Sequence, residues 1–153
     1  MQKAVLLHNI RSVHNVGSIF RTSDGAGVSK VFLSGYSPTP IDQHGVARKD
    51  LSKVALGAEK FVPWEYEKNP YQVIQKLREQ GWHIVGVEQD TRSIDYRTFK
   101  PKNKPVLYIF GNEVRGMSPA LRAHCDEIVE IPMNGKKESL NVSVSAGIIL
   151  FSA

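Results

Sequence analysis

The stretch MNGKKESLNVSVSAGIILF, residues 133–151, supports two opposite interpretations of the end of the chain. From Leu140 to Ala146, apolar and polar residues alternate, which is typical of a half-exposed β-strand. Ser139 resembles the N-cap of a helix, because its side-chain oxygen could accept a hydrogen bond from a backbone N–H. The residues that follow it are unusually small for either element. Residue types and spacing leave the choice between strand and helix open.

The rest of the chain alternates between strand and helix patterns. The run VLYIFG (106–111) is almost continuously apolar, as expected of a strand that is buried on both faces. Further strands are predicted over 3–8, 30–35, 82–89 and 126–132, and another around Phe61 and Val62. Helices are predicted over 15–27 with Asn15 as N-cap, over 69–81 with Asn69 as N-cap, and over 118–125 with Ser118 as N-cap. Residues 90–105 are expected to form a polar loop. This alternation predicts an α/β fold with a mainly parallel sheet flanked by helices, in one domain spanning residues 1–153.

Composition indicates the class of protein, the kind of partner and the cellular compartment. It has 153 residues, of which 41% are hydrophobic and 23% charged, as in an ordinary globular protein. The net charge of +5 favours a polyanionic partner such as nucleic acid. Cys125 is the single cysteine, so no intramolecular disulfide can form, and a reducing compartment, the cytoplasm, is expected. No apolar run is long enough to span a membrane, so no membrane partner is expected.

Three polar loops follow predicted strands, where open parallel sheets bind their ligands. They contain NIRSVHNVGSIFRT (9–22), GNEVRGMS (111–118) and MNGKKESLN (133–141). The first lacks the glycine fingerprint of a dinucleotide site, and the chain has no P-loop. The histidines are not spaced as zinc ligands, so no metal site is predicted. Taken singly, Arg21, Glu113 and Asn141 each have an ordinary structural explanation: a surface arginine, an acid at a helix start and a turn residue.

Taken together, these stretches resemble a known family. HNIRSVHNVGSIFRTSDGAGV (8–28), LYIFGNEVRGMSP (107–119) and IPMNGKKESLNVSVSAGIILF (131–151) are similar, in this order, to the three motifs of SpoU/TrmH-type RNA 2′-O-ribose methyltransferases of the SPOUT superfamily. ALGAEKFVPW (55–64) also resembles that family. The likeness runs from about Lys3 to the end of the chain.

The resemblance implies a deep trefoil knot at the C-terminus, although chains generally avoid threading loops. It implies that SLNVSVSAGIILF (139–151) is a helix that passes through a loop and packs on the sheet and on a partner subunit. Small residues would then allow the backbones to approach closely, namely Ser143, Ser145, Ala146 and Gly147. The strand-like alternation of the opening stretch would be misleading.

The resemblance also implies a cofactor and a set of site residues. The cofactor is S-adenosylmethionine, with Gly111, Ile131 and Leu140 at the positions that hold its adenosine part. The polar active-site positions of the family fall on Asn15, Arg21, Glu113, Ser139 and Asn141. The counterpart of Arg21 is the family's proposed base, but a guanidinium normally holds its proton. We therefore expect Arg21 to align an RNA phosphate and to stabilise the developing alkoxide charge.

The family pattern leads to expectations about partners. A homodimer is expected, built by the first and the last helix. Many members carry an extra RNA-binding domain or terminal extensions; neither is expected here, and the chain is expected to be a minimal version or to lack a tail. RNA capture would then use Arg11, Arg48, Lys49, Lys136 and Lys137, and tRNA is favoured over rRNA. The alternatives are a non-catalytic RNA-binding module on the same fold and, disfavoured by the missing glycine fingerprint, a nicotinamide-cofactor enzyme.

Overall fold

Seven parallel strands form a single sheet in the computed structural model, which describes residues 2–153. The strand order is β3-β2-β1-β6-β4-β7-β5. The two central strands, β1 and β6, are flanked by paired strands on both sides, and every residue of β6 is buried. The strands are β1 (Lys3–His8), β2 (Lys30–Ser34), β3 (Trp64–Tyr66), β4 (His83–Val87), β5 (Ile94–Asp95), β6 (Val106–Phe110) and β7 (Glu127–Glu130). The predicted parallel α/β fold is confirmed.

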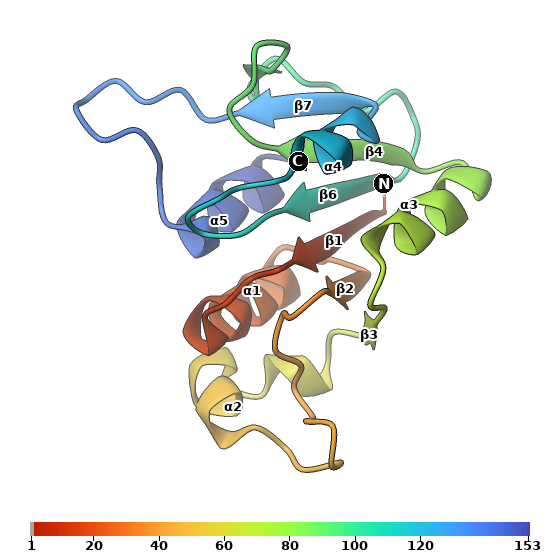
Figure 1. Cartoon of the computed structure of the whole chain (residues 1–153), viewed down its shortest axis with the longest axis vertical. Coiled ribbons are helices and arrows are strands. Elements are labelled where there is room, and N and C mark those ends of the chain that lie inside the picture. The colour runs from red at the N-terminus through yellow and green to blue at the C-terminus, as the bar shows by residue number, and fades with distance from the viewer. Residues whose placement is uncertain (1) are drawn as a thin grey trace.

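Helices cover both faces of this sheet (Figure 1). The helices are α1 (Val13–Gly25), α2 (Lys49–Ala55), α3 (Pro70–Glu79), α4 (Pro119–Ala123) and α5 (Val142–Ser152), with a short 3-10 helix at Ala58–Lys60. Alternate residues of β1 point to opposite sides, because side chains alternate along a strand. Val5 and Leu7 pack with α1, α2 and α5, whereas Ala4 and Leu6 pack with α3 and α4.

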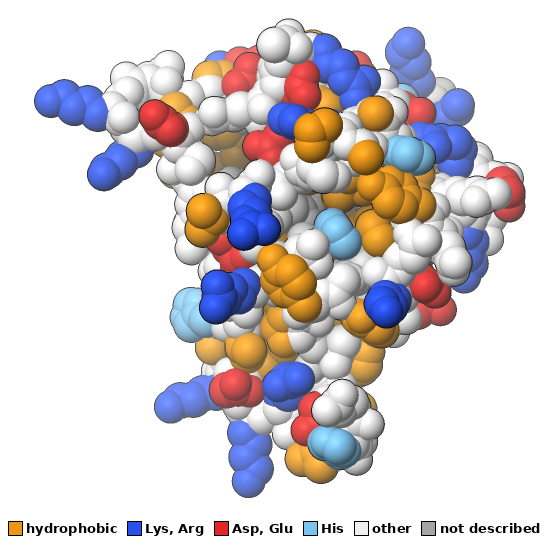
Figure 2. All heavy atoms as spheres, in the orientation of Figure 1, with side chains coloured by type: hydrophobic (Ala, Val, Ile, Leu, Met, Phe, Trp, Pro, Cys, Tyr) orange, Lys and Arg blue, Asp and Glu red, His pale blue; other side chains and the backbone are white. Residues whose placement is uncertain are grey.

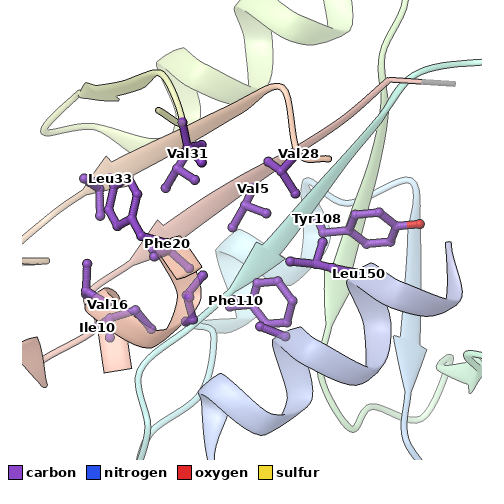
Figure 3. Packing of buried hydrophobic residues seen from close by; sticks show 14 of the residues in the cluster. Val5, Ile10, Val16, Phe20, Val28, Val31, Leu33, Tyr108, Phe110 and Leu150 are labelled. Carbon is purple, nitrogen blue, oxygen red and sulfur yellow. The ribbon is translucent and has the colours of Figure 1, made fainter. Parts of the chain in front are cut away.

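The larger core lies under α1 and α5. Phe20 of α1 and Leu150 of α5 are fully buried there with Phe110, which lies at the end of β6. Figure 3 shows these side chains gathered between the sheet and the two helices. Burying side chains of this size removes much apolar surface from water, which is the main favourable contribution to folding. The same packing brings the first and last helices of the chain side by side.

The first helix begins earlier than the sequence predicts. Ser12, not Asn15, is its N-cap, because Ser12 Oγ accepts a hydrogen bond from Asn15 N at 3.1 Å. Val16, Ile19 and Phe20 form the buried stripe of this helix, which ends at Gly25, two residues before the predicted end. The prediction failed at the start because serine and asparagine are comparable caps, and local sequence does not rank them. Asn15 is left with its side chain available for another role.

The opening stretch forms a helix, α5, and not a strand. Asn141, rather than Ser139, is its N-cap, since Asn141 Oδ1 accepts a hydrogen bond from Ser143 N at 2.8 Å. Beyond the alternating residues the helix is apolar on all sides, although only Ala146, Ile149 and Leu150 are buried within the chain. At its other end, Lys3 Nζ donates to the carbonyl oxygen of Leu150 at 2.8 Å. The alternation was misleading because contacts from distant parts of the chain determine this element.

Two smaller predictions need correction. Phe61 and Val62 do not lie in a strand; they follow the 3-10 helix, and the strand β3 begins at Trp64. The loop 90–105 contains the two-residue strand β5, which pairs with β7. Both errors concern short segments, where few residues carry a periodic pattern. The predictions for α3 and α4 are confirmed, including the caps Asn69 and Ser118.

Across residues 2–153, none of the helices combines the length and the apolar character that crossing a bilayer would require.

Candidate active site

A cavity lies beyond the carboxyl ends of β4, β6 and β7, and two of the three loops predicted to carry the chemistry, 111–118 and 133–141, contribute to its lining. The segment between β7 and α5 projects from the body (Figure 1), and Figure 2 shows a hollow between this projection and the rest of the molecule. The cavity is lined by Val87–Gln89, Phe110–Gly116, Ile131, Met133, Ser139, Leu140, Val142 and Ser145. Segments far apart in the sequence therefore form one binding surface, as expected for this type of sheet.

The loop after β6 turns back sharply at Gly111. A Cβ atom on Gly111 would lie 2.7 Å from Met117 Cγ and 2.8 Å from the carbonyl carbon of Gly116, closer than real Cβ contacts allow. Gly116 has a φ of +66°, which favours glycine. The glycines thus let the loop fold against itself, with Asn112 and Gly116 paired by an antiparallel bridge. A larger residue at Gly111 would push this wall of the cavity outward.

Glu88 fixes the same loop to the end of β4. Its Oε2 atom accepts a hydrogen bond from Met117 N at 2.8 Å. The neighbouring Gln89 donates from Nε2 to the carbonyl oxygen of Glu138 at 2.6 Å. Consecutive residues after β4 therefore hold the loop after β6 and the projecting segment before α5. The cavity wall is held by tertiary hydrogen bonds and not by a single continuous element.

Glu113 joins the second motif to the first. Its carboxylate accepts hydrogen bonds from Arg11 N at 3.0 Å, from Ser12 N at 2.9 Å and from Asn15 Nδ2 at 3.1 Å. Partial burial alone would raise the pKa of Glu113, but these donors together hold it below its usual value. Glu113 therefore stays ionised near neutral pH and occupies the N-terminal end of α1, where negative charge is favourable. Glu113 thus contacts Asn15, another of the residues predicted for the active site.

Asn112 connects this site to the loop after β2. Its Nδ2 atom donates to the carbonyl oxygen of Asn9 and to the Tyr36 hydroxyl oxygen, both at 3.0 Å. Its Oδ1 atom accepts from the backbone of Val114 and Arg115 at 2.9 Å. One amide thus organises both the glycine loop and the neighbouring surface.

The three residues expected at the cofactor line the cavity together: Gly111, Ile131 and Leu140. Ile131, Leu140 and Val142 supply apolar walls, which suit a planar base. The charged side chains in the lining are Glu88, Glu113 and Arg115, and no lysine is among them. A predominance of carboxylates suits a cationic sulfonium. The residues present therefore fit S-adenosylmethionine.

The polar residues predicted for catalysis are only partly gathered. Glu113 and Ser139 line the cavity, and Asn15 is buried against Glu113. Asn141 lies next to the lining as the cap of α5. Arg21 lies in α1 but is exposed and does not line this cavity. Within one chain, the structure therefore brings four of the five positions to one region and leaves Arg21 outside it.

Comparison with known proteins identifies the family. The model of the SpoU rRNA Methylase family matches residues 2–151. The chain belongs to this family. Its members include the 23S rRNA (guanosine-2′-O-)-methyltransferase RlmB of Neisseria meningitidis serogroup B, to which the chain is 37% identical over 146 residues, covering 95% of the chain and 55% of that protein. The chain thus spans about half the length of the curated relatives it matches.

Solved structures of SpoU-type enzymes superpose closely on the chain. The AdoMet-bound rRNA methyltransferase from Sinorhizobium meliloti has a TM-score of 0.89 at 30% identity, covering 99% of this chain and 55% of that one. The TrmH/SpoU tRNA modifying enzyme of A. aeolicus has a TM-score of 0.84 at 30% identity, covering 99% of this chain and 73% of that one. The match to the SpoU structures implies the knotted fold that the resemblance predicted.

Sequence reasoning missed Glu88, Asn112 and Tyr36. Glu88 directly follows β4, so the rule that ligands bind at the carboxyl ends of strands could have found it. Asn112 lies inside a motif that was identified, next to the more obvious Glu113. Tyr36 follows β2 in GYSPTP (35–40), a turn-rich stretch whose relation to the site depends on tertiary contacts. Nothing in the local sequence indicates that Tyr36 contacts Asn112.

Proposed function

We propose that this chain transfers a methyl group from S-adenosylmethionine to a ribose 2′-hydroxyl of RNA. One observation carries the proposal: the cavity unites the second and third SpoU motifs, while Glu113 binds the first motif through three hydrogen bonds. The bound cofactor would supply an electrophilic methyl group, and the ribose hydroxyl would lose its proton as its oxygen is methylated. The S. meliloti relative is described as AdoMet-bound, which supports this choice of cofactor.

The cavity walls have separate roles in this proposal. Gly111, Ile131 and Leu140 hold the adenosine part, and the nearby carboxylates favour the positive sulfonium over a neutral ligand. Ser139, at the mouth of the cavity, and Asn141 position the ribose and the start of α5. Holding the hydroxyl in line with the methyl group supplies much of the acceleration in such a reaction.

Arg21 acts on the RNA in this proposal, outside the cavity of its own chain. Its exposed guanidinium aligns a phosphate and stabilises negative charge that develops on the ribose oxygen. A pH–rate profile without an ionisation that depends on Arg21 would support this role over that of a base. An ionisation that disappears in Arg21→Lys would contradict it.

We propose a homodimer built on α1 and α5. Val144 and Phe151 of α5 are 49% and 64% exposed, which is high for apolar side chains on one short helix. Phe151 lies against the end of α1, since a Cβ on Gly25 would lie 3.2 Å from its ring. Exposed apolar side chains of α5 therefore reach the end of α1. Light scattering should give twice the mass of the chain, and a fully active monomer would contradict the proposal.

The substrate proposed is an RNA ribose, without further restriction. Among relatives, RlmB of N. meningitidis is named for a guanosine of 23S rRNA and the A. aeolicus protein for tRNA. The expectation of tRNA therefore stays a prediction that experiment must decide.

The deciding experiment uses labelled S-adenosylmethionine and total RNA from a strain that lacks this protein. Wild type and Arg21→Ala are compared, and labelled RNA is separated by size and mapped for 2′-O-methylation. Label in tRNA or rRNA with wild type alone supports the function and the role of Arg21. Thermal-shift measurements with S-adenosylhomocysteine and NAD run in parallel, because a ligand selective for the native state raises its melting temperature. RNA binding without cofactor binding would favour a non-catalytic RNA-binding module.

A further inference from the structure

Three hollows with shared lining residues extend from the cavity to the loop after β2. The cavity shares Asn112, Glu113, Val114 and Arg115 with a second hollow at the start of α1. That hollow shares Arg11 and Tyr36 with a third, which extends to Arg48 and Tyr66. We call the third hollow the β2 pocket. Apart from Arg11, its lining residues lie outside the three motifs.

Tyr36 stands at the entrance to the β2 pocket. Its side chain is 58% exposed, although most aromatic side chains of the described residues are more buried. Its position is nevertheless fixed, because its hydroxyl oxygen accepts from Asn112 Nδ2 at 3.0 Å and its backbone N–H donates to Asn9 Oδ1 at 3.1 Å. The Tyr66 hydroxyl donates to the carbonyl oxygen of Gly35 at 2.6 Å and steadies the same turn. An aromatic ring that is fixed in position but exposed to solvent can stack with a base.

Two arginine side chains line the same hollows as the Tyr36 ring. Arg11 lines both hollows together with Tyr36, and Arg48 lines the β2 pocket. Arg48 Nε is buried and has no hydrogen-bond partner in the part of the chain that the structure describes. The one carboxylate in the pocket, Asp42, already accepts from the backbone N–H groups of His44 and Val46. Guanidinium groups in the same hollows as an exposed aromatic ring suit a strand of RNA, whose phosphates and bases can bind to the two kinds of group.

We propose that the β2 pocket binds an unpaired nucleotide beside the one that is methylated. Its base stacks on Tyr36, while Arg11 and Arg48 contact the flanking phosphates. The hollow at the start of α1 shares lining residues with both the pocket and the cavity, so one strand that crosses it can reach both when its bases are unstacked from a duplex. The inference rests on the proposed function, because it requires RNA at the cavity. It also predicts that the substrate is a loop, bulge or end, where bases are free to stack on protein.

The test uses a single-stranded RNA of about 12 nucleotides that contains 2-aminopurine, whose fluorescence falls when the base stacks; this length matches the usual site sizes. Wild-type protein with S-adenosylhomocysteine should bind the RNA and quench the probe. Tyr36→Ala should lose both the quenching and roughly fivefold or more in affinity. Tyr36→Phe, which keeps the ring and loses the hydroxyl, should remain within about twofold of wild type. Phe61→Ala is the matched control, since Phe61 is 76% exposed and lines none of the three hollows.

The outcomes separate this inference from the proposed function. If wild type methylates RNA and Tyr36→Ala binds the probe as tightly as wild type, the stacking site is wrong and the methyltransferase proposal stands. If wild type neither binds the probe nor methylates RNA, both fail. If Tyr36→Ala also loses S-adenosylhomocysteine binding, its loop has rearranged and Arg48→Gln decides instead. That variant should reduce the slope of log affinity against log salt by about one, the value for a lost phosphate contact, and an unchanged slope would overturn the inference.

Discussion

The helices α3 and α5 are of similar length but are specified in different ways. Asn69 and Pro70 mark the start of α3, its apolar residues recur at helical spacing, and its outer face is polar. The sequence of α5 alternates like a strand and then becomes apolar on all sides. Its start lies beside the cavity, and its end is held by Lys3 from β1. Local sequence is sufficient to predict α3, whereas α5 depends on what surrounds it.

This difference matches what each helix does. α3 covers one face of the sheet through Val73, Ile74 and Leu77 and lines none of the hollows at the site. α5 fills the larger core and also supplies Val142 and Ser145 to the cavity. A helix that serves core, cavity and proposed dimer face at once has no free polar side. Its sequence consequently lacks the amphipathic pattern on which prediction depends.

The largest contrast should come from deleting one buried leucine in each helix. Leu150→Ala should destabilise the protein by about 3–5 kcal/mol and Leu77→Ala by about 2–4 kcal/mol, through lost burial and a residual cavity. Only Leu150→Ala should also weaken S-adenosylhomocysteine binding, because α5 carries part of the cavity. Urea unfolding and calorimetric titration measure the two effects. Equal losses of cofactor affinity in both variants would remove the distinction between the helices.

The next effect concerns Glu113, whose carboxylate joins the loop after β6 to the start of α1. The pKa of Glu113 is lower in the folded protein than in the unfolded chain, so its stabilisation is present above the unfolded pKa. It is lost as the pH falls through the folded pKa. Glu113→Gln should destabilise the protein by about 1–2 kcal/mol at pH 7, at the low end for charged hydrogen bonds because the carboxylate is partly exposed.

The measurement is the thermal midpoint of wild type and Glu113→Gln from neutral to acidic pH. The difference between the two should shrink as the pH falls through the folded pKa of Glu113. A difference that stays constant would show that Glu113 acts without its charge. Glu79→Gln is the matched control, because Glu79 is exposed on α3; its thermal midpoint should follow that of wild type at each pH.

A smaller contrast comes from the two asparagine caps. Asn69→Ala and Asn141→Ala should each cost about 1 kcal/mol of stability, since each side chain accepts one backbone hydrogen bond at a helix start. Methyl transfer should fall by roughly tenfold or more in Asn141→Ala alone, because displacement of the reacting groups lowers the rate. Single-turnover assays at saturating cofactor would detect the difference. Comparable activity in both variants would show that Asn141 is only a cap.

The smallest effect tests Gly147 in α5. A Cβ at Gly147 would meet only Thr22 Cγ2, at 4.0 Å, so the fold of one chain does not need glycine there. In an isolated chain, Gly147→Ala should stabilise the helix by up to about 1 kcal/mol. If a partner subunit packs closely on this point, the variant should instead weaken the dimer. Stability measured over a range of protein concentrations separates the two outcomes.

Much of the site could be predicted from residues, but its connections could not. Gly111, Ile131 and Leu140, which the motifs assign to the cofactor, line one cavity in the structure. The hydrogen bonds of Glu88 to Met117 and of Asn112 to Tyr36 join residues 29 and 76 positions apart. No local pattern encodes such pairs, because they depend on which loops the sheet brings together. The misplaced caps Asn15 and Ser139 have the same origin, since several nearby side chains could cap each helix and packing selects among them.

The sequence by itself determined the class of fold, the order of most elements and, through its three motifs, the family. These properties are carried by hydrophobic runs, caps and motif residues that lie close together along the chain. Only the tertiary structure decided that the alternating stretch at the end is a helix, that Ser12 and Asn141 are the caps, and that Tyr36 borders the site. Their free energies depend on neighbours contributed by distant segments: Glu113 for the start of α1, Lys3 for α5 and Asn112 for Tyr36. Such contacts form only when the strands have assembled into the sheet.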